Sequence, residues 1–294
     1  MNQTELNQAA NALYSAKGAG LSPEQVVRAL YRGASLTPEQ VAKALYAINL
    51  SPERVAKALH STEGASLSPE RVANGLYSKE GAALDATEVV RALRSLDLSA
   101  NEVARALYYG SNLASEIVAW ALHAEEGANL SPEVVARVLR SLDLSPEQVA
   151  NGLYSAKGAN LYATEVAKAL YSAEGAGLTP EELARALYRG ADLSSEEIAR
   201  ALYSPKGANL TEKEIARVLY LKEGAALDAT EVVRALYSEE GADLTVEEVV
   251  RALYSEEGAN LNSEEVQAAL YRGTDLNSEK MRAALQINQQ KGNQ

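Results

Sequence analysis

The chain has 294 residues, a net charge of −12 and 47% hydrophobic residues, and it contains neither Cys nor Phe. The hydrophobic content is enough to bury a core, and the absence of Cys excludes disulfides and thiolate metal sites. The negative net charge disfavours binding to nucleic acid or to an anionic membrane. The first residues, MNQTELNQAANALYS, lack a basic segment followed by an apolar one, and no apolar run could span a bilayer. We therefore expect a cytoplasmic or otherwise soluble protein without signal peptide or transmembrane segment.

One short phrase recurs along the whole chain. A degenerate copy begins near Thr4, and from there the phrase restarts with a leucine every 14, 15 or 17 residues. The leading leucines are Leu21, Leu36, Leu50, Leu67, Leu84, Leu98, Leu113, Leu130, Leu144, Leu161, Leu178, Leu193, Leu210, Leu227, Leu244, Leu261 and Leu276. No linker or change of composition interrupts the series, so we predict a single repeat domain over residues 1–294.

Each unit has the signals of one short helix. In LSPEQVVRALYRGAS, residues 21 to 35, Ser22 suits the N-cap and Pro23 the first helical position. Gln25 completes a capping box with Ser22. Gly33 stands where a left-handed residue would end the helix. The sequence therefore predicts about 18 helices, one for each unit.

The positions within a unit, counted from its leading leucine, divide into two faces. Positions 6 and 10, Val26 and Leu30 in the first full unit, share an apolar face, with small residues beside them. Positions 4, 8 and 11, Glu24, Arg28 and Tyr31, form the opposite stripe. The few aliphatic side chains of one helix cannot offset the entropy lost on ordering it, so neighbours must stack. We predict an all-α superhelical solenoid whose successive helices turn sharply or run antiparallel, and whose hand, right or left, stays undetermined.

Both ends of the series are polar. The first unit carries Asn7, Gln8 and Asn11, and the last trails into QINQQKGNQ. Terminal repeats of a solenoid need a polar outer face, because they would otherwise expose the apolar stacking surface. We therefore interpret residues 1–20 as an N-terminal capping repeat and residues 276–294 as a C-terminal capping repeat with a polar tail.

The unit openings LTPEQV, at 36 to 41, and LSPEQV, at 21 to 26 and 144 to 149, resemble the first helix of TAL-effector repeats. The resemblance covers about six residues per unit and implies a helical solenoid. TAL-effector repeats read DNA one base at a time, through a residue pair in the loop between two helices. They are about twice as long as these units, and no position here matches that pair, so no base-reading residue is carried over. More broadly, the chain is similar to α-solenoid families, whose usual role is to hold a partner.

The polar stripe has two interpretations. Position 8 is Arg or Lys in twelve of the seventeen units that begin at a leading leucine, and Glu at position 4 precedes it by one turn, as in Glu181–Arg185. This spacing favours ion pairs within each helix and a solvated, self-neutralised face. Tyr dominates position 11 and suits either packing on the next helix or an aromatic strip for a partner. The alternative function is nucleic-acid binding, with phosphates on the basic column and bases on the tyrosines.

One segment breaks the repeat rule most clearly. In LASEIVAWALHAEEGAN, residues 113 to 129, Trp120 occupies the polar position 8 and Ile117 the polar position 5. Aromatic anchors in an exposed apolar patch are typical of binding interfaces, so we expect partner binding or self-association here, with local packing as the alternative. The candidate partner-binding residues are Trp120, Ile117, Val134, Tyr108, Tyr109 and His123.

A second departure is acidic. Residues 238 to 265 hold nine acids against Arg251 alone. The candidate acidic-patch residues are Glu239, Glu240, Glu247, Glu248, Glu256 and Glu257. Such a run is either a solvated face or a dock for a basic partner.

No residue pattern indicates an enzyme. Catalysis needs a unique constellation, whereas the carboxylates here recur at every helix start, and no phosphate-loop, zinc or nucleophile motif is present. His60 and His123 stand far apart and replace Tyr in their units. We therefore expect no catalytic, cofactor or metal site, and we predict a non-enzymatic scaffold that binds a protein or peptide. The alternatives are nucleic-acid binding and an engineered or structural repeat module without a ligand.

Overall fold

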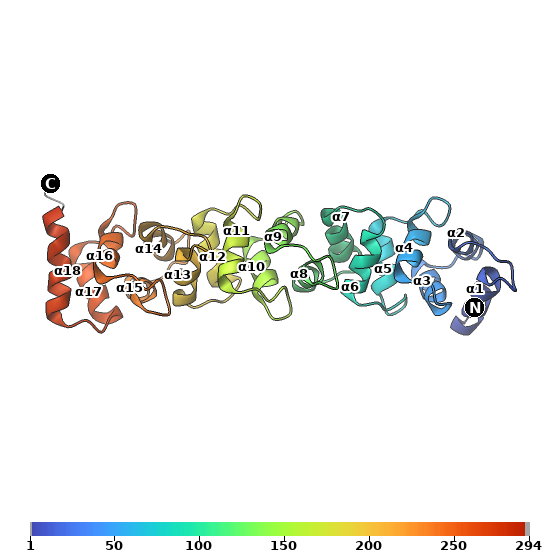
Figure 1. The fold of residues 1–294 in the computed structure, drawn as a ribbon, viewed down its shortest axis with the longest axis horizontal. Coiled ribbons are helices and arrows are strands. Elements are labelled where there is room, and N and C mark those ends of the chain that lie inside the picture. Colours follow the sequence, from blue (N-terminus) through green and yellow to red (C-terminus); the bar gives the residue numbers. More distant parts are fainter. Residues whose placement is uncertain (1, 292–294) are drawn as a thin grey trace. The chain divides into compact units, whose positions relative to one another are not determined.

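The computed structural model describes residues 2–291, apart from the side chains of Ser278 and of residues 287–291. Over this part of the chain there are 18 α-helices and no strand, which confirms the all-α prediction of one helix per unit (Figure 1). The helices are α1 (Gln3–Tyr14), α2 (Pro23–Arg28), α3 (Pro38–Ala47), α4 (Pro52–His60), α5 (Pro69–Tyr77), α6 (Ala86–Arg94), α7 (Ala100–Arg105), α8 (Ser115–His123), α9 (Pro132–Arg140), α10 (Pro146–Tyr154), α11 (Ala163–Tyr171), α12 (Pro180–Arg189), α13 (Ser195–Tyr203), α14 (Glu212–Tyr220), α15 (Ala229–Tyr237), α16 (Val246–Tyr254), α17 (Ser263–Gly273) and α18 (Ser278–Lys291). Two short π-helical segments, η1 (Ala29–Gly33) and η2 (Ala106–Gly110), continue α2 and α7.

The helix starts follow the predicted capping chemistry. The Ser22 hydroxyl accepts the N–H of Gln25 at 3.3 Å, and the Gln25 side chain accepts the N–H of Ser22 at 3.0 Å. Pro23 occupies the first turn of α2, where no backbone donor is needed. The same reciprocal pair of hydrogen bonds recurs at most of the described helix starts, so these helices begin at the predicted N-cap residues.

The prediction that Gly33 ends its helix in the left-handed region is wrong. Gly33 lies in η1, where the N–H of Ala34 donates to the carbonyl of Ala29. The left-handed residue is instead the one directly before the next leading leucine, here Ser35 with φ 56°. The residues in this place are Gly20, Ser35, Asn49, Ser66, Ala83, Asp97, Asn112, Asn129, Asp143, Asn160, Gly177, Asp192, Asn209, Ala226, Asp243 and Asn260. The sharp change of direction therefore comes at the end of the loop, where it sends the chain into the next helix.

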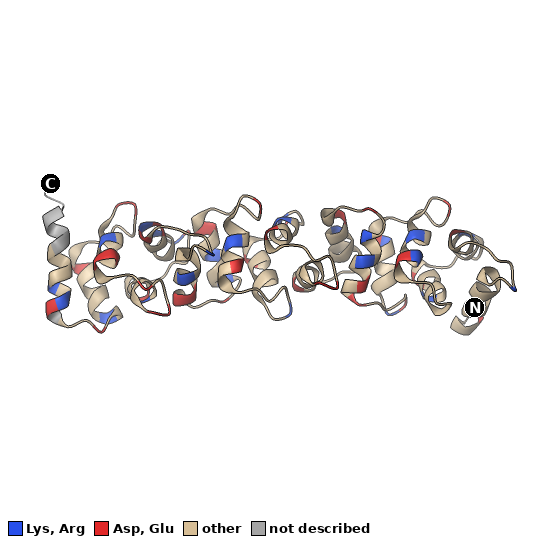
Figure 2. Ribbon diagram, in the orientation of Figure 1, with Lys and Arg blue, Asp and Glu red and all other residues tan. Residues whose placement is uncertain are grey.

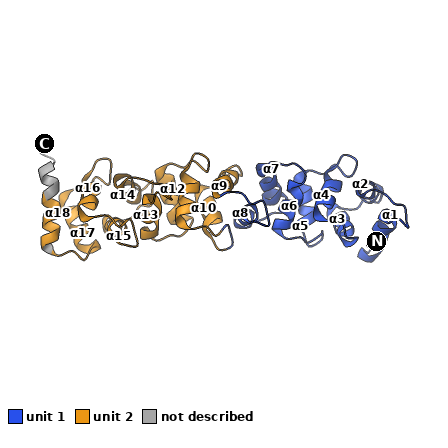
Figure 3. Ribbon diagram, in the orientation of Figure 1, with its two compact units in different colours: residues 1–131, 157–159 blue, residues 132–156, 160–294 orange. Residues whose placement is uncertain are grey.

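Helices of the same compact unit pack on the next helix and on the second-next. The chain forms two compact units, unit 1 (Met1–Ser131 with Lys157–Ala159) and unit 2 (Pro132–Ala156 with Asn160–Gln294) (Figure 3). In unit 1, α1, α3, α5 and α7 with η2 form one row, and α2, α4, α6 and α8 form the other. In unit 2 the odd helices α9 to α17 and the even helices α10 to α18 form two rows in the same way. This arrangement of consecutive helices is that of a solenoid within each unit.

The core lies between the two rows and within each row. In α13, Ile198, Ala199, Ala201 and Leu202 have no exposed surface, and the leading Leu193 is 3% exposed. These are the predicted apolar positions 6, 7, 9 and 10. Alanine at two of the four lets the helices approach closely, which is how so short a helix buries an apolar face on two sides.

Candidate partner-binding surfaces

The polar stripe forms rungs between helices. A Glu at position 4 of one helix pairs with the base at position 8 of the second-next helix in the same row. The pairs are Lys168 Nζ with Glu133 at 3.0 Å, Arg185 Nε with Glu147 at 3.1 Å and Arg217 Nη2 with Glu181 at 2.9 Å. Asn74 in α5 makes the neutral version of this rung, since its Nδ2 donates to Glu39 Oε1 at 2.8 Å.

The predicted pairing of Glu181 with Arg185 inside α12 is therefore wrong. Arg185 reaches back to Glu147 of α10, and Glu181 accepts from Arg217 of α14. The physical reason is that the row places helices side by side, so that a neighbour offers a carboxylate within reach of each guanidinium. A spacing rule for an isolated helix cannot anticipate that competition.

Several bases also hold the loop on their other side. Arg185 Nη1 donates to the carbonyl of Glu223 at 3.1 Å, so that one side chain joins α10, α12 and the loop after α14. Arg137 does the same to the carbonyl of Glu174 at 2.9 Å, and Arg200 to that of Glu239 at 3.1 Å. These cations therefore stabilise contacts between neighbouring helices and loops of the solenoid.

The rung also sets the acidity of Glu147. Burial acts to raise its pKa, but hydrogen bonds from its own N–H, Ser145 and Arg185, together with the Arg185 charge, lower that pKa below the ordinary value of 4.5. A carboxylate that stays ionised keeps the rung in place near neutral pH.

The tyrosines at position 11 do not form a continuous exposed strip. Among them Tyr46, Tyr188, Tyr203 and Tyr271 are exposed. The others are half-buried. The guanidinium of Arg54 lies 5.9 Å from the centre of the Tyr14 ring, and that of Arg71 lies 5.8 Å from the centre of the Tyr31 ring. Much of the column therefore takes part in packing between helices.

Five of the six predicted partner-binding residues lie in unit 1, on η2, which continues α7, and on α8, and four of these five are aromatic or apolar side chains. Trp120 is 39% exposed and Tyr109 54% exposed, whereas Ile117 and Tyr108 are half-buried. The rings of Tyr108 and Tyr109 meet edge to face with centroids 5.0 Å apart, and η2 packs against α8. We call these four residues the α7–α8 aromatic surface.

The other two predicted residues have different surroundings. His123 ends α8, and its Nδ1 lies 2.9 Å from the carbonyl of Leu130. His60 repeats this contact with Leu67 at 2.8 Å, so both histidines tie their helix end to the following loop. Val134 is half-buried in α9, which belongs to unit 2.

The predicted acidic patch is partly used by the fold. Glu248 accepts the Thr245 hydroxyl at 2.8 Å and caps α16, and this bond lowers its pKa. Glu257 accepts from Lys213 Nζ at 2.8 Å, which lowers its pKa too. Glu247 is half-buried, while Glu239, Glu240 and Glu256 are exposed. Figure 2 shows Lys and Arg mixed with Asp and Glu along the helices of both units.

Sequence reasoning missed Tyr162. It occupies the N-cap of α11 and is 80% exposed, the largest exposure among the described large hydrophobic side chains. A hollow of about 420 Å³ beside it is lined by residues that include Tyr154, Asn160 and Leu161. The signal was available, because position 2 is Ser, Thr, Asp or Asn in every unit that starts at a leading leucine except those of Ala114 and Tyr162.

No group of three or more His, Asp or Glu side chains within residues 2–291 could hold a metal ion. Within the same residues no helix is long and apolar enough to cross a membrane. The comparisons with known proteins find no family that matches the chain and no match among curated proteins.

Proposed function

We propose that the protein is a non-enzymatic repeat scaffold that binds a protein or peptide through the α7–α8 aromatic surface. The observation that carries the proposal is Trp120. It stands exposed at position 8, where other helices place the cation of a rung. Tryptophan and tyrosine are the residues that most often dominate the binding energy of an interface.

Helix α8 lacks two stabilising devices that other helices of the chain have. Its N-cap is Ala114, which makes no side-chain cap bond, and Trp120 cannot form the charged rung. An N-cap side chain contributes about 1 kcal/mol to a helix. Helix α8 thus gives up local stability while its surface gains an exposed aromatic ring. This combination is expected where residues are selected for function rather than for folding.

The geometry of the basic column weighs against the nucleic-acid alternative. Arg185, Arg200 and Arg217 direct their guanidinium groups at carboxylates and carbonyls of neighbouring helices. A phosphate would have to displace those partners. The tyrosines that would stack bases are largely half-buried.

The proposal is tested with the substitution Trp120→Arg, which restores the residue type that most units carry. Purified tagged wild type, Trp120→Arg and Tyr203→Ala are compared in quantitative pull-downs. Tyr203 is the matched control, because it is also 39% exposed but obeys the repeat rule. We expect a partner that wild type and Tyr203→Ala retain and that Trp120→Arg binds at least about tenfold more weakly.

Circular dichroism and thermal melting must show that Trp120→Arg stays folded. Retention of the same proteins with the same affinity by all three chains would remove the α7–α8 aromatic surface as the binding site. Capture of nucleic acid that declines steeply with salt would favour the alternative instead.

A further inference from the structure

Gly33 corresponds to two glycines that allow a close approach between helices, but no such approach occurs at Gly33 itself. Gly110 and Gly190 end units of the same length, and a Cβ on them would lie 2.4 Å from the Glu70 carbonyl oxygen and 2.3 Å from that of Glu147. Both glutamates are at position 4 of the helix two places earlier. The glycine therefore lets one helix end rest on the first turn of the other.

Gly33 is the equivalent residue at the end of the α2 unit, yet a Cβ on it would meet nothing within 4 Å. The reason is that α2 has no helix two places before it within the described chain. Gly33 would therefore permit another helix to approach closely, and within the described residues no helix lies there.

The N-terminal edge exposes the residue positions that the stack buries elsewhere. Ala12 of α1 is exposed, and Ala9, Leu13 and Ala29 are half-exposed. At the corresponding positions of α13 no surface is accessible. These small or aliphatic residues lie at positions that pack against other helices in the rest of the stack.

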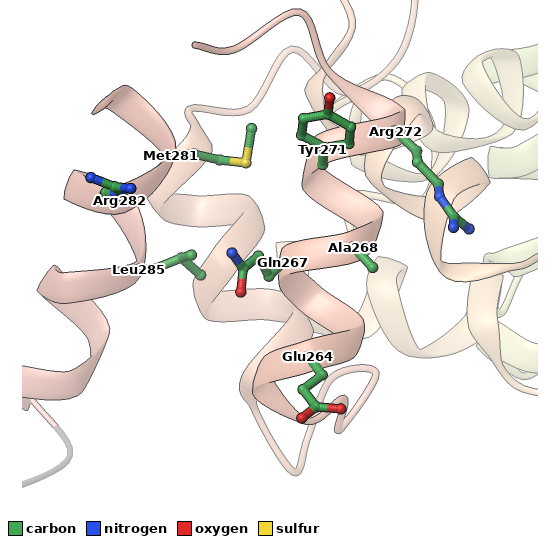
Figure 4. A pocket seen from close by; sticks show the side chains of 8 residues that line it. All are labelled: Glu264, Gln267, Ala268, Tyr271, Arg272, Met281, Arg282 and Leu285. Carbon is green, nitrogen blue, oxygen red and sulfur yellow. The ribbon is translucent and has the colours of Figure 1, made fainter. Parts of the chain in front are cut away.

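The C-terminal edge offers the complementary face. A groove of about 510 Å³ lies between α17 and α18, and Gln267, Met281 and Leu285 point into the space between the two helices (Figure 4). Tyr271 on its rim is 73% exposed. Ala268, also in its lining, replaces the bulky base of position 8. The groove continues the rows in which α15 packs on α17 and α16 on α18.

The rung chemistry of the two edges matches in register. Glu264 and Glu279 are at position 4 of α17 and α18, and Asn11 and Arg28 are at position 8 of α1 and α2. Among the described residues none of these four side chains makes a hydrogen bond or an ion pair.

Three contacts follow if α1 is set on α17 and α2 on α18. Asn11 meets Glu264 as Asn74 meets Glu39, and Arg28 meets Glu279 as Arg185 meets Glu147. Gly33 meets the backbone of Glu279 as Gly190 meets that of Glu147. Each of the three contacts repeats a kind of contact that the chain makes between its own helices: an amide rung, a charged rung and a close backbone approach.

We propose that copies of this chain associate head to tail, with α1 and α2 of one copy stacking on α17 and α18 of the next. Such an interface uses two different surfaces, so it adds copies until a ring closes or a filament grows. It is separate from the α7–α8 aromatic surface. It also opposes the interpretation of the ends as polar caps, which would keep the chain monomeric.

The test measures mass against protein concentration by sedimentation and light scattering on the full chain. We expect the mass of wild type to rise with concentration. Arg28→Glu, Glu279→Arg and Gly33→Ala should each weaken association at least about tenfold, by like charge or by a Cβ in the contact. An equimolar mixture of Arg28→Glu and Glu279→Arg should associate again, because an interface between the two variants pairs opposite charges in either order.

Two matched variants serve as controls. Glu174→Arg makes the same charge change at an exposed residue between α11 and α12, away from both edges, and Trp120→Arg removes the aromatic surface. Both should associate like wild type. The proposal is overturned if wild type stays monomeric up to millimolar concentration, or if the three edge variants associate like wild type. It is also overturned if Trp120→Arg alone abolishes association.

Discussion

At the scale of single residues, the turn before each leading leucine shows how backbone strain is distributed. Asn and Asp tolerate the left-handed region better than other side chains, and Gly20 and Gly177 enter it freely. Ala83 and Ala226 are also there, with φ 55° and 60°. Neither of these two side chains gains a local hydrogen bond in return, so each stores strain in the native chain.

The strain predicts that Ala226→Gly stabilises the protein. We expect an increase of about 1 kcal/mol in the free energy of unfolding, because glycine removes the Cβ clash of the left-handed region. Gly177→Ala is the reverse exchange at φ 62°, in a place where a Cβ would meet nothing within 4 Å, and it should lose a similar amount. Urea unfolding of both variants checks this, and equal stabilities would refute it.

At the scale of the element, a helix of ten residues such as α12 is held by its cap, its buried face and its two rungs. The rungs differ from ordinary surface ion pairs, because a side chain such as Arg185 is 30% exposed and bonds to two other segments. Charge-assisted hydrogen bonds of this kind contribute more than an exposed pair does.

We predict that Arg185→Ala lowers the free energy of unfolding by about 1–2 kcal/mol at neutral pH. Arg189→Ala, which removes an exposed base from the same helix, should change it by less than about 0.5 kcal/mol. The pKa of Glu147 is lowered in the folded chain, so the rung stabilises fully above the unfolded value near 4.5 and loses its effect as pH falls below it.

The difference between wild type and Arg185→Ala should therefore shrink in acid. Chemical unfolding measured at neutral pH and at steps below pH 4.5 compares the two chains. A difference that stays constant across that range would mean that the Glu147 carboxylate is not the partner that matters.

At the scale of the whole molecule, the main contacts among the described helices of each compact unit join a helix to the next and the second-next. Stability in such an array is a sum of local helix and neighbour terms. Among the described helices, the first helices of a compact unit do not pack on its last ones, unlike in a globular core. A destabilising substitution should therefore lower stability mainly in the helices next to it.

We predict that Leu202→Ala accelerates amide hydrogen exchange mainly in α11 to α15. The substitution removes a fully buried side chain of α13, with an expected loss of roughly 2–5 kcal/mol of local stability. Helices α17 and α18 of the same unit should change less, and Tyr203→Ala should have little effect. Mass spectrometry of exchanged peptides measures this, and a uniform acceleration across unit 2 would contradict it.

Much of the fold was predictable because its signals are local. Caps such as Ser22 with Gln25 act within one turn, and the apolar period acts within one helix, so helix number, starts and buried faces follow from the sequence. The candidate site was predictable only where a residue breaks the repeat, as Trp120 does. Tyr162 breaks it as clearly, at the cap rather than on the stripe.

By itself, the sequence determined an all-helical repeat with one capped helix per unit, because capping and amphipathic period depend on residues a few places apart. Only the tertiary structure decided which partners the polar residues take. Glu181 bonds to Arg217 rather than Arg185, and the left-handed turn is at Ser35 rather than Gly33. Those outcomes depend on which helix lies beside which, and a second helix 36 residues away competes for a side chain that local spacing assigns to its own turn.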